Sequence, residues 1–361
     1  MFILKESEIE QLIKIKDAVN KGLSLGSLTE ICTDIAPLVE DKKFVYTYAA
    51  CLLASRDRID DAMQMFILNI EDTFCKIMHD YLEETGSFEL ADKVFKSSDP
   101  YDIYTQTEFF KKHQSGALKH ILKFAQQNPP PKTALPITIL DVGVGNGEFI
   151  TKIVNEIIPL YNIKSIRLII LDQSEDMLRT AKENCEKSIN IPTEIISICC
   201  KIQDITKQQF ETINEVKPIW FINAGLSIHH MPKEKKIPML KNLRKLSPKL
   251  VLTEVNWNHD LPEKDSPELL YSVAKSYGVF SESILSLPIS EERRKLCLYN
   301  FPVAEAINII KQDREHRIDY HTSIKEWQSI AGEAGFKAEE AVANYVSDNQ
   351  AFSFVMEMHD N

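Results

Sequence analysis

The sequence predicts an α/β protein in which a mostly parallel sheet follows a lobe of helices, and three observations lead to this fold class. From residue 6 to about 96, apolar residues recur at three- and four-residue spacing, as they do along helices. A run of prolines at 129–131 ends this pattern, because consecutive prolines cannot continue a helix. Beyond it, apolar runs alternate with amphipathic segments, which is typical of a parallel sheet covered on both faces. We therefore expect a helical cap over 1–128 and a sheet domain over 133–361.

The N-terminal segment is expected to form about five short helices, because glycines interrupt its periodicity. Gly22, Gly26 and Gly86 mark the breaks, and Ser27 followed by Glu30 has the pattern of a helix N-cap. A helical-repeat array is the alternative, but no sequence period recurs across these residues. The segment is therefore interpreted as a cap or lobe.

The second part of the chain is expected to form the sheet and the helices that cover it. Strands are expected at 137–140, 166–171, 194–198, 219–223 and 250–254, with helices at 148–161, 174–187 and 233–246. After strand five come a helical insertion from 257 to about 311, a helix at 323–334 and a terminal pair of strands near 337–343 and 351–356.

Composition and charge exclude several classes of function. Acidic residues exceed basic ones to a net charge of −11, so the surface should repel nucleic acid and anionic membranes. No apolar run approaches the ~20 residues that cross a bilayer, and charged residues follow Met1–Leu4 at once, unlike in a signal peptide. The 7 cysteines, an odd number without Cys-x-x-Cys spacing, disfavour a disulfide framework and a zinc cluster. A cytoplasmic protein with reduced thiols is expected, with no nucleic-acid or membrane partner.

A glycine-rich turn, from Asp141 to Glu148, stands directly after the first strand. Glycines there allow positive φ and let a ligand lie against the backbone. A dinucleotide site needs its third glycine at position 148, where Glu148 would instead place a carboxylate near the pyrophosphate, so that site is disfavoured. Asp172 ends the second strand, where a carboxylate can accept hydrogen bonds from both ribose hydroxyls; a turn or a helix cap is the alternative interpretation.

The spacing Gly143-x-Gly145-x-Gly147 resembles the first motif of class I S-adenosylmethionine-dependent methyltransferases. The predicted element order is also similar to their Rossmann-like sheet, in which the last strand inserts antiparallel. The resemblance implies S-adenosylmethionine as the cofactor, and it implies that Asp204 accepts the adenine amino group, with a surface turn as the alternative. The implied cofactor-binding residues are Asp141, Gly143, Gly145, Gly147, Asp172, Gln173, Gln203, Asp204, Asn223 and Ala224.

The end of the fourth strand, Asn223-Ala224, and the following His229-His230 resemble the fourth motif of the same family. Asn223, His229 and Glu254 are the expected catalytic residues. A histidine, with an ordinary pKa of about 6.5, can orient or deprotonate an acceptor, and packing on the next helix is the alternative. No metal is expected, because adjacent histidines rarely converge on one ion. The acceptor would be a small molecule in a cleft closed by helices; a homodimer interface is the alternative use of those helices.

A further series of residues follows strand five. Its members are Tyr271, Tyr277, Glu305, Asn308, Arg314, Arg317, Trp327 and Gly335. This series looks like the C-terminal half of the GRAS proteins, plant regulators built on a methyltransferase fold, and of their bacterial relatives. The plant proteins have lost much of the glycine-rich turn, which this chain keeps. The sequence therefore favours a methyltransferase, and a non-catalytic GRAS-like interaction module that retains cofactor binding is the alternative.

Overall fold

The computed structural model describes residues 4–89, 99–132, 136–347 and 350–360. The end of the helical stretch expected to about residue 96 lies outside these ranges. The chain forms two compact units, each built from two stretches of sequence. The helical unit comprises residues 1–111 and 257–320, and the sheet unit comprises residues 112–256 and 321–361.

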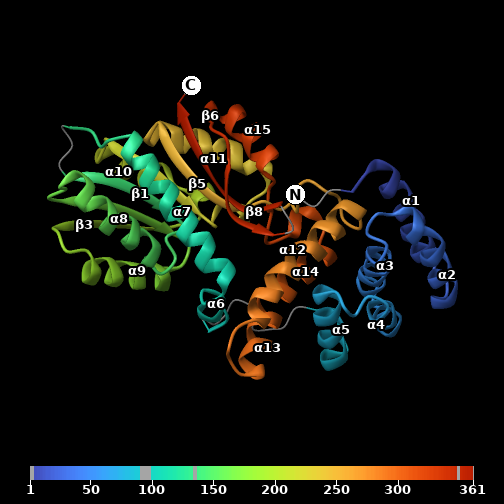
Figure 1. Ribbon diagram of the computed structural model, residues 1–361. Coiled ribbons are helices and arrows are strands. Elements are labelled where there is room, and N and C mark those ends of the chain that lie inside the picture. The colour runs from blue at the N-terminus through green and yellow to red at the C-terminus, as the bar shows by residue number, and fades with distance from the viewer. Residues whose placement is uncertain (1–3, 90–98, 133–135, 348–349, 361) are drawn as a thin grey trace. The chain divides into compact units, whose positions relative to one another are not determined.

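The sheet unit contains one mixed sheet with the strand order β3-β2-β1-β4-β5-β8-β6, and β7 pairs with β8 (Figure 1). Strands β1 to β5 run parallel, and β8 runs antiparallel to β5, β6 and β7. The predicted α/β class with a mostly parallel sheet is confirmed. The strands are β1 (Ile137–Val142), β2 (Ile166–Asp172), β3 (Thr193–Cys199), β4 (Ile219–Gly225), β5 (Lys249–Val255), β6 (Phe336–Ala338), β7 (Val342–Ser347) and β8 (Gln350–Asp360).

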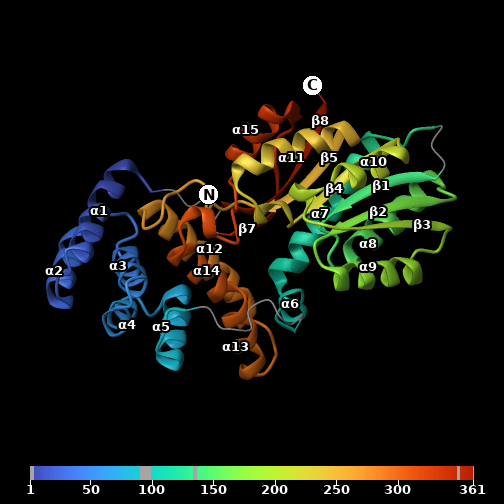
Figure 2. The ribbon, with the colours of Figure 1, turned by 180° about the vertical axis from the view of Figure 1, so that it is seen from behind.

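Helices cover both faces of the sheet, which Figures 1 and 2 show from opposite sides. Successive side chains point to opposite faces of a strand, so each central strand contributes to two layers. Ile139 and Leu168 belong to one core, whereas their neighbours Leu140 and Ile169 belong to the other. The first core includes α7 (Glu108–Gln127), α8 (Glu148–Tyr161) and α9 (Glu175–Ser188), and the second includes α10 (Lys207–Glu215), α11 (Lys233–Leu246) and α15 (Ile324–Ala334).

Most predicted elements of the sheet unit are confirmed, and the bounds expected for α8 and α11 are those observed. Two details differ. The segment predicted as one strand near 337–343 divides between β6 and β7, and α10 was not predicted from the sequence. The helix α10 is short and polar, with Ile213 as its one fully buried residue, so its apolar periodicity is weak.

The helical unit consists of α1 (Glu6–Asn20), α2 (Leu25–Ile35), α3 (Phe44–Ala54), α4 (Ile59–Ile67), α5 (Thr73–Thr85), α6 (Asp99–Tyr104), α12 (Pro267–Leu285), α13 (Glu291–Asn300) and α14 (Pro302–Lys311). The largely buried helix α12 contacts α3, α5 and α14. An aromatic cluster adds to this core: the ring of Tyr104 lies 4.8 Å from that of Phe280 and 5.0 Å from that of Phe301.

These units differ from the predicted domains in two places. Helix α7 was expected in the cap, but its residues Ile121 and Phe124 are buried in the sheet unit, where the Phe124 ring lies 5.6 Å from that of Phe221. Helices α12 and α13 were expected as part of the sheet domain, but they contact α3, α5 and α6. A helix joins the core that its apolar face reaches, and chain order does not reveal which core that is.

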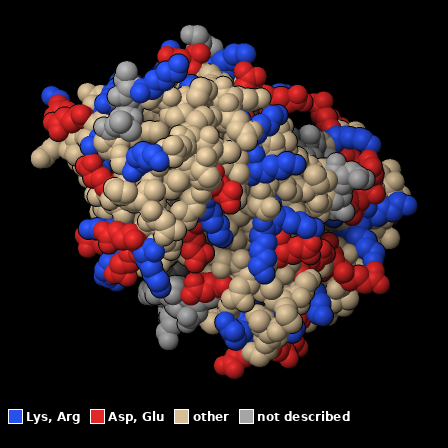
Figure 3. All heavy atoms as spheres, turned by 60° about the vertical axis from the view of Figure 1, so that its left-hand side comes forward, with Lys and Arg blue, Asp and Glu red and all other residues tan. Residues whose placement is uncertain are grey.

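The described residues contain no helix that is both long and apolar enough to cross a membrane. On the face shown in Figure 3, acidic and basic side chains are interspersed. The net charge of −11 is therefore not segregated into one acidic patch on that face.

Candidate functional site

The loops that follow β1, β2, β4 and β5 all lie at the carboxyl edge of the parallel sheet. The strand order reverses direction between β1 and β4, because β1 pairs with β2 on one side and with β4 on the other. Ligands of open α/β sheets bind outside the strand ends at such a switch point. The glycine-rich turn predicted from the sequence follows β1, at this position.

The three glycines of this turn all have positive φ, with values of 71° at Gly143, 55° at Gly145 and 78° at Gly147. A Cβ atom at Gly143 would lie 2.2 Å from the Cβ of Ser227, and one at Gly147 would lie 2.7 Å from the Cα of Ala181 in α9. A Cβ at Gly145 would have no atom within 4 Å. Gly143 and Gly147 are therefore required by internal packing, whereas Gly145 borders open space.

Asp172 lies at the end of β2 and is half-buried. One carboxylate oxygen, Oδ2, accepts a hydrogen bond from the Gly145 backbone N–H at 3.1 Å. The other, Oδ1, accepts one from the Ser174 N–H at 3.0 Å, directly before α9. The Asp172 carboxylate therefore fixes the turn at Gly145 and also supports the start of α9. A structural role in a turn, the alternative interpretation of Asp172 from the sequence, is thus observed.

Asp141 and Asn223 form a buried pair on β1 and β4, where they lie opposite one another in the strand register. The Asn223 Nδ2 atom donates a hydrogen bond of 2.6 Å to Asp141 Oδ1. Burial raises the pKa of the Asp141 carboxyl to about 7; the Asn223 hydrogen bond opposes this shift and the charge of Asp172 adds to it. The Oδ1 atom of Asn223 has no hydrogen-bond partner among the described residues. A proton on Asp141 would supply that partner and complete an acid–amide pair with two hydrogen bonds.

Glu254, at the end of β5, holds the loop that follows β4. Its Oε1 atom accepts hydrogen bonds from the Ser227 N–H at 3.2 Å and the Ile228 N–H at 3.1 Å. The Ser227 hydroxyl in turn donates to the Val142 carbonyl oxygen at 2.9 Å. Ser227 therefore joins the glycine turn to the loop after β4. It also lies so close to Gly143 that a side chain at position 143 would have no room.

The second oxygen of Glu254, Oε2, lies 2.9 Å from Nδ1 of His229. Burial opposes ionisation of Glu254, but the charge and hydrogen bond of His229, together with the Ile228 N–H, outweigh it and hold the pKa below its ordinary value. The His229 side chain is 11% exposed, and its ring stacks on that of His321 with centroids 4.5 Å apart and planes at 19°. The structure therefore brings two of the three expected catalytic residues into one buried dyad.

The third expected catalytic residue, Asn223, lies elsewhere. Its neighbours Ile222 and Ala224 belong to the core beneath α11, as do Leu250 and Leu252 of β5. By strand alternation Asn223 points to the opposite face, whereas Glu254 shares the face of Leu252. Asn223 pairs with Asp141 rather than with the dyad.

Lys236 of α11, whose side chain is fully buried, was not among the residues predicted from the sequence. Its Nζ donates a hydrogen bond to the Thr322 hydroxyl and lies 5.3 Å from the centre of the Trp327 ring. Its charge contributes to lowering the pKa of Glu254. Lysine is rarely buried, but a helix of mixed composition does not show from sequence which of its lysines faces inward. Apolar neighbours one turn away, such as Leu240, are the available signal.

The remaining cofactor-binding candidates lie at or just after the ends of neighbouring strands. Gln173 is exposed after β2, and its carbonyl oxygen accepts a hydrogen bond from Cys199. Gln203 and Asp204 belong to a short 3-10 turn, Ile202–Asp204, after β3, where Asp204 is exposed. Ala224 is buried on β4. Their expected contacts with a cofactor stay predictions.

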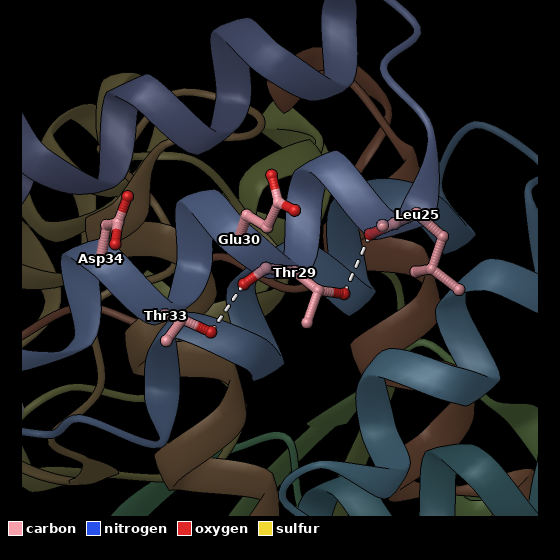
Figure 4. Close-up of a pocket in the computed structure, with 6 residues that line it drawn as sticks. Leu25, Thr29, Glu30, Thr33 and Asp34 are labelled. Atoms are coloured by element: carbon pink, nitrogen blue, oxygen red, sulfur yellow. Dashed lines mark hydrogen bonds between the residues drawn. The ribbon is translucent and has the colours of Figure 1, made fainter.

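Other features of the described residues supply weaker sites. His79, Asp80 and Glu83 of α5 place possible ligand atoms within 4.8 Å of one another, but such groups are common on helix surfaces without an ion, and the expectation of no metal stays a prediction. A surface depression lies along α2 (Figure 4), where the Thr29 and Thr33 hydroxyls donate to backbone carbonyls one turn earlier. These hydroxyls serve the helix itself.

Solved structures that match this chain with TM-scores of 0.50 or more share its fold. The rice protein SCL7 (Oryza sativa) matches with a TM-score of 0.62 and 13% identity, over 80% of this chain and 90% of that one. The CMeT domain of the citrinin polyketide synthase matches with a TM-score of 0.50 and 14% identity, over 82% and 69%. Magnesium protoporphyrin IX methyltransferase from Synechocystis, solved with bound SAH, matches at 0.42 and 14%, over 79% and 99%.

No curated protein matches the sequence significantly. The model of the GRAS domain family matches residues 149–359. The matched region begins directly after the glycine-rich turn and ends within β8, so it includes Asp172, His229 and Glu254 but not the three glycines. Because this match covers more than half of the 361 residues, the chain belongs to the GRAS domain family.

Proposed function

We propose that this protein binds S-adenosylmethionine at the turn after β1 and transfers its methyl group to a small acceptor. One observation carries the cofactor assignment: Gly145 has positive φ, borders open space and is bonded through its N–H to Asp172. A ligand there can lie directly against the backbone, beside a carboxylate suited to two hydroxyl groups. The residues present therefore fit the cofactor that the sequence motif implies.

The sulfonium methyl of S-adenosylmethionine is already reactive, so the protein needs mainly to align the acceptor and exclude water. The turn backbone and Asp172 would hold the cofactor, and Ser227 connects that turn to the loop carrying His229. The dyad of His229 and Glu254 then supplies the group that acts on the acceptor. The net charge of −11 favours a neutral or cationic acceptor over a polyanion such as nucleic acid.

A non-catalytic GRAS-like interaction module is the second candidate. It is supported by the family match, which starts after the glycine turn, and by the similarity to SCL7 over 80% of this chain. In that case the glycine turn would retain the cofactor without methyl transfer, and the helical unit would hold a protein partner.

Calorimetric titration of the full-length protein with S-adenosylmethionine and with its demethylated product tests the proposal. Asp172→Ala should weaken binding about 10-fold or more, because hydrogen bonds to a charged acceptor contribute about 1.5 to 3 kcal/mol. Gly145→Val should abolish binding, because its side chain enters the open space. Gly22→Val is the matched control, because Gly22 also has positive φ, 70°, and no atom within 4 Å of its Cβ position.

If the parent protein binds neither molecule, or if Gly145→Val binds as tightly as the parent, the cofactor assignment is wrong. Incubation with methyl-labelled S-adenosylmethionine and pools of small metabolites then separates the two candidates. Transfer of label to a metabolite supports the enzyme. Tight binding without transfer to any metabolite favours the interaction module.

A further inference from the structure

We propose that the methyl acceptor carries a weakly acidic hydroxyl group, a phenol or an enol, and that His229 removes its proton while Glu254 acts as a positioning residue. This inference rests on the proposed function and names the class of acceptor used at that site. It follows from how the Glu254 carboxylate divides its contacts, from the charges around it and from how the His229 ring is held.

The Glu254 carboxylate contacts both the loop after β4 and the His229 ring. Its Oε1 atom alone accepts both backbone N–H groups of the loop, from Ser227 and Ile228. Its Oε2 atom is directed at His229 Nδ1, at 2.9 Å. When Nδ1–H donates to this oxygen, the other ring nitrogen, Nε2, is the one that can accept a proton. The same carboxylate therefore holds the loop and selects the proton-accepting form of the imidazole.

The charges around the dyad keep the Glu254 carboxylate ionised. Glu254 is 1% exposed, and its pKa lies below the ordinary value despite that burial. Lys236 contributes to this effect, so a buried cation helps to keep the carboxylate ionised. An ionised carboxylate against Nδ1 stabilises the imidazolium that forms when the ring accepts a proton, as it does in other carboxylate–histidine pairs.

Neighbouring residues hold the ring in place. The His229 ring stacks on His321 at 4.5 Å between centroids. The next residue, Thr322, accepts a hydrogen bond from Lys236, which lies over the Trp327 ring. Rotation of His229 would therefore break both its carboxylate contact and its stacking contact. A group held in this way is suited to proton transfer, which depends on geometry before acidity.

The strength of this base selects the acceptor class. A carboxylate acceptor has no proton to remove, and an aliphatic hydroxyl, a much weaker acid than a phenol, gives up its proton to an imidazole less readily. A phenol, with a pKa of about 10, lies within the reach of a histidine base. In the reaction the O–H proton moves to His229, an oxygen lone pair forms the O–CH₃ bond, and the C–S bond breaks with its electron pair left on sulfur. The products are a methyl ether, a neutral thioether and an imidazolium.

The test compares phenol with 4-nitrophenol, which is largely ionised at a mildly alkaline pH and needs no base. The full-length parent, His229→Gln, Glu254→Gln and Glu254→Asp are assayed with labelled S-adenosylmethionine, and acetylacetone serves as the enol probe. His229→Gln should lower kcat on phenol by about 100-fold or more, the usual contribution of a general base, and change kcat on 4-nitrophenol by less than about 3-fold. Glu254→Gln should show the same selectivity, and Glu254→Asp should partly restore kcat on phenol. His316→Gln, at an exposed position, is the control.

Equal losses on both phenols would assign His229 a structural role and overturn the proposal. Equal activity of parent and His229→Gln on phenol would also overturn it. A parent that binds S-adenosylmethionine but methylates none of the three probes would refute the acceptor class while leaving cofactor binding intact. Failure to bind S-adenosylmethionine would instead overturn the proposed function itself. Calorimetric cofactor binding by each variant confirms that its turn is intact.

Discussion

Replacing Asp141 by Asn should stabilise the protein at alkaline pH but have little effect at acidic pH. The pKa of this buried carboxyl is raised from 3.8 to about 7, mainly by burial. A carboxyl with a raised pKa in the folded state binds its proton more tightly there than in the unfolded chain. Its stabilising contribution is therefore fully present below pH ~4 and is lost as the pH rises through about 7.

The expected magnitude follows from the same shift. A change of about 3 pKa units is equivalent to about 4 kcal/mol of unfolding free energy, and this is an upper value. The amide of Asn carries no charge and supplies an N–H group that Asn223 Oδ1 lacks among the described residues. The variant therefore avoids the ionisation cost and can complete both hydrogen bonds of the pair.

Urea unfolding of the parent and Asp141→Asn, followed by circular dichroism near pH 4.5 and pH 8, measures the effect. We expect the variant to be more stable by about 2 to 4 kcal/mol at the higher pH and to differ little at the lower one. Asp204→Asn is the control, because Asp204 is exposed. The reasoning is refuted if Asp141→Asn is less stable than the parent at pH 8, or if its effect is the same at both pH values.

Three further predictions concern the glycine turn, the acid side of the stability profile and the buried lysine. Gly147→Ala should lower the free energy of unfolding by about 2 to 4 kcal/mol, because its Cβ would lie 2.7 Å from the Cα of Ala181. Gly145→Ala should lower it by only about 1 kcal/mol, because its Cβ meets open space and only the positive φ is unfavourable. Urea unfolding compares the two variants, and equal losses would contradict the assigned roles. Burial lowers the pKa of His113 to about 4, and the Glu254 charge acts in the opposite direction. The contribution of neutral His113 to stability is therefore present above pH ~6.5 and is lost as the pH falls through about 4. His113→Gln should therefore reduce the loss of melting temperature between pH 7 and pH 4, and an unchanged profile would argue against this origin. Lys236→Met should shift the pKa of Glu254 upward, because a buried positive charge is removed, and carbon-13 NMR of the Glu254 carboxyl would show it; no shift would mean that Lys236 does not act on this carboxylate.

The sequence by itself determined the local structure of the sheet unit. Apolar runs alternating with amphipathic segments predicted β1 to β5 and α8, α9, α11 and α15, because these periodicities are properties of neighbouring residues. The glycine spacing predicted a turn with positive φ, which all three glycines show. The resemblance to GRAS proteins is likewise confirmed by the family match over residues 149–359.

The tertiary structure alone decided which of these residues act together. The sequence spacing does not distinguish the three glycines. In the structure Gly143 packs against Ser227 and Gly147 against Ala181, whereas a Cβ at Gly145 would meet open space. Chain order assigned α7 to the cap, but its apolar face is buried on the sheet.

The dyad shows the same limit of sequence reasoning. Glu254 and His229 were both predicted, yet only the pairing of β4 with β5 brings them to 2.9 Å. The burial of Lys236 had only a weak sequence signal, its apolar neighbours one turn away, and the stacking of His321 had none. Contacts between distant residues depend on how helices and strands pack, and hydrophobic periodicity specifies which face of an element is buried without specifying what it is buried against.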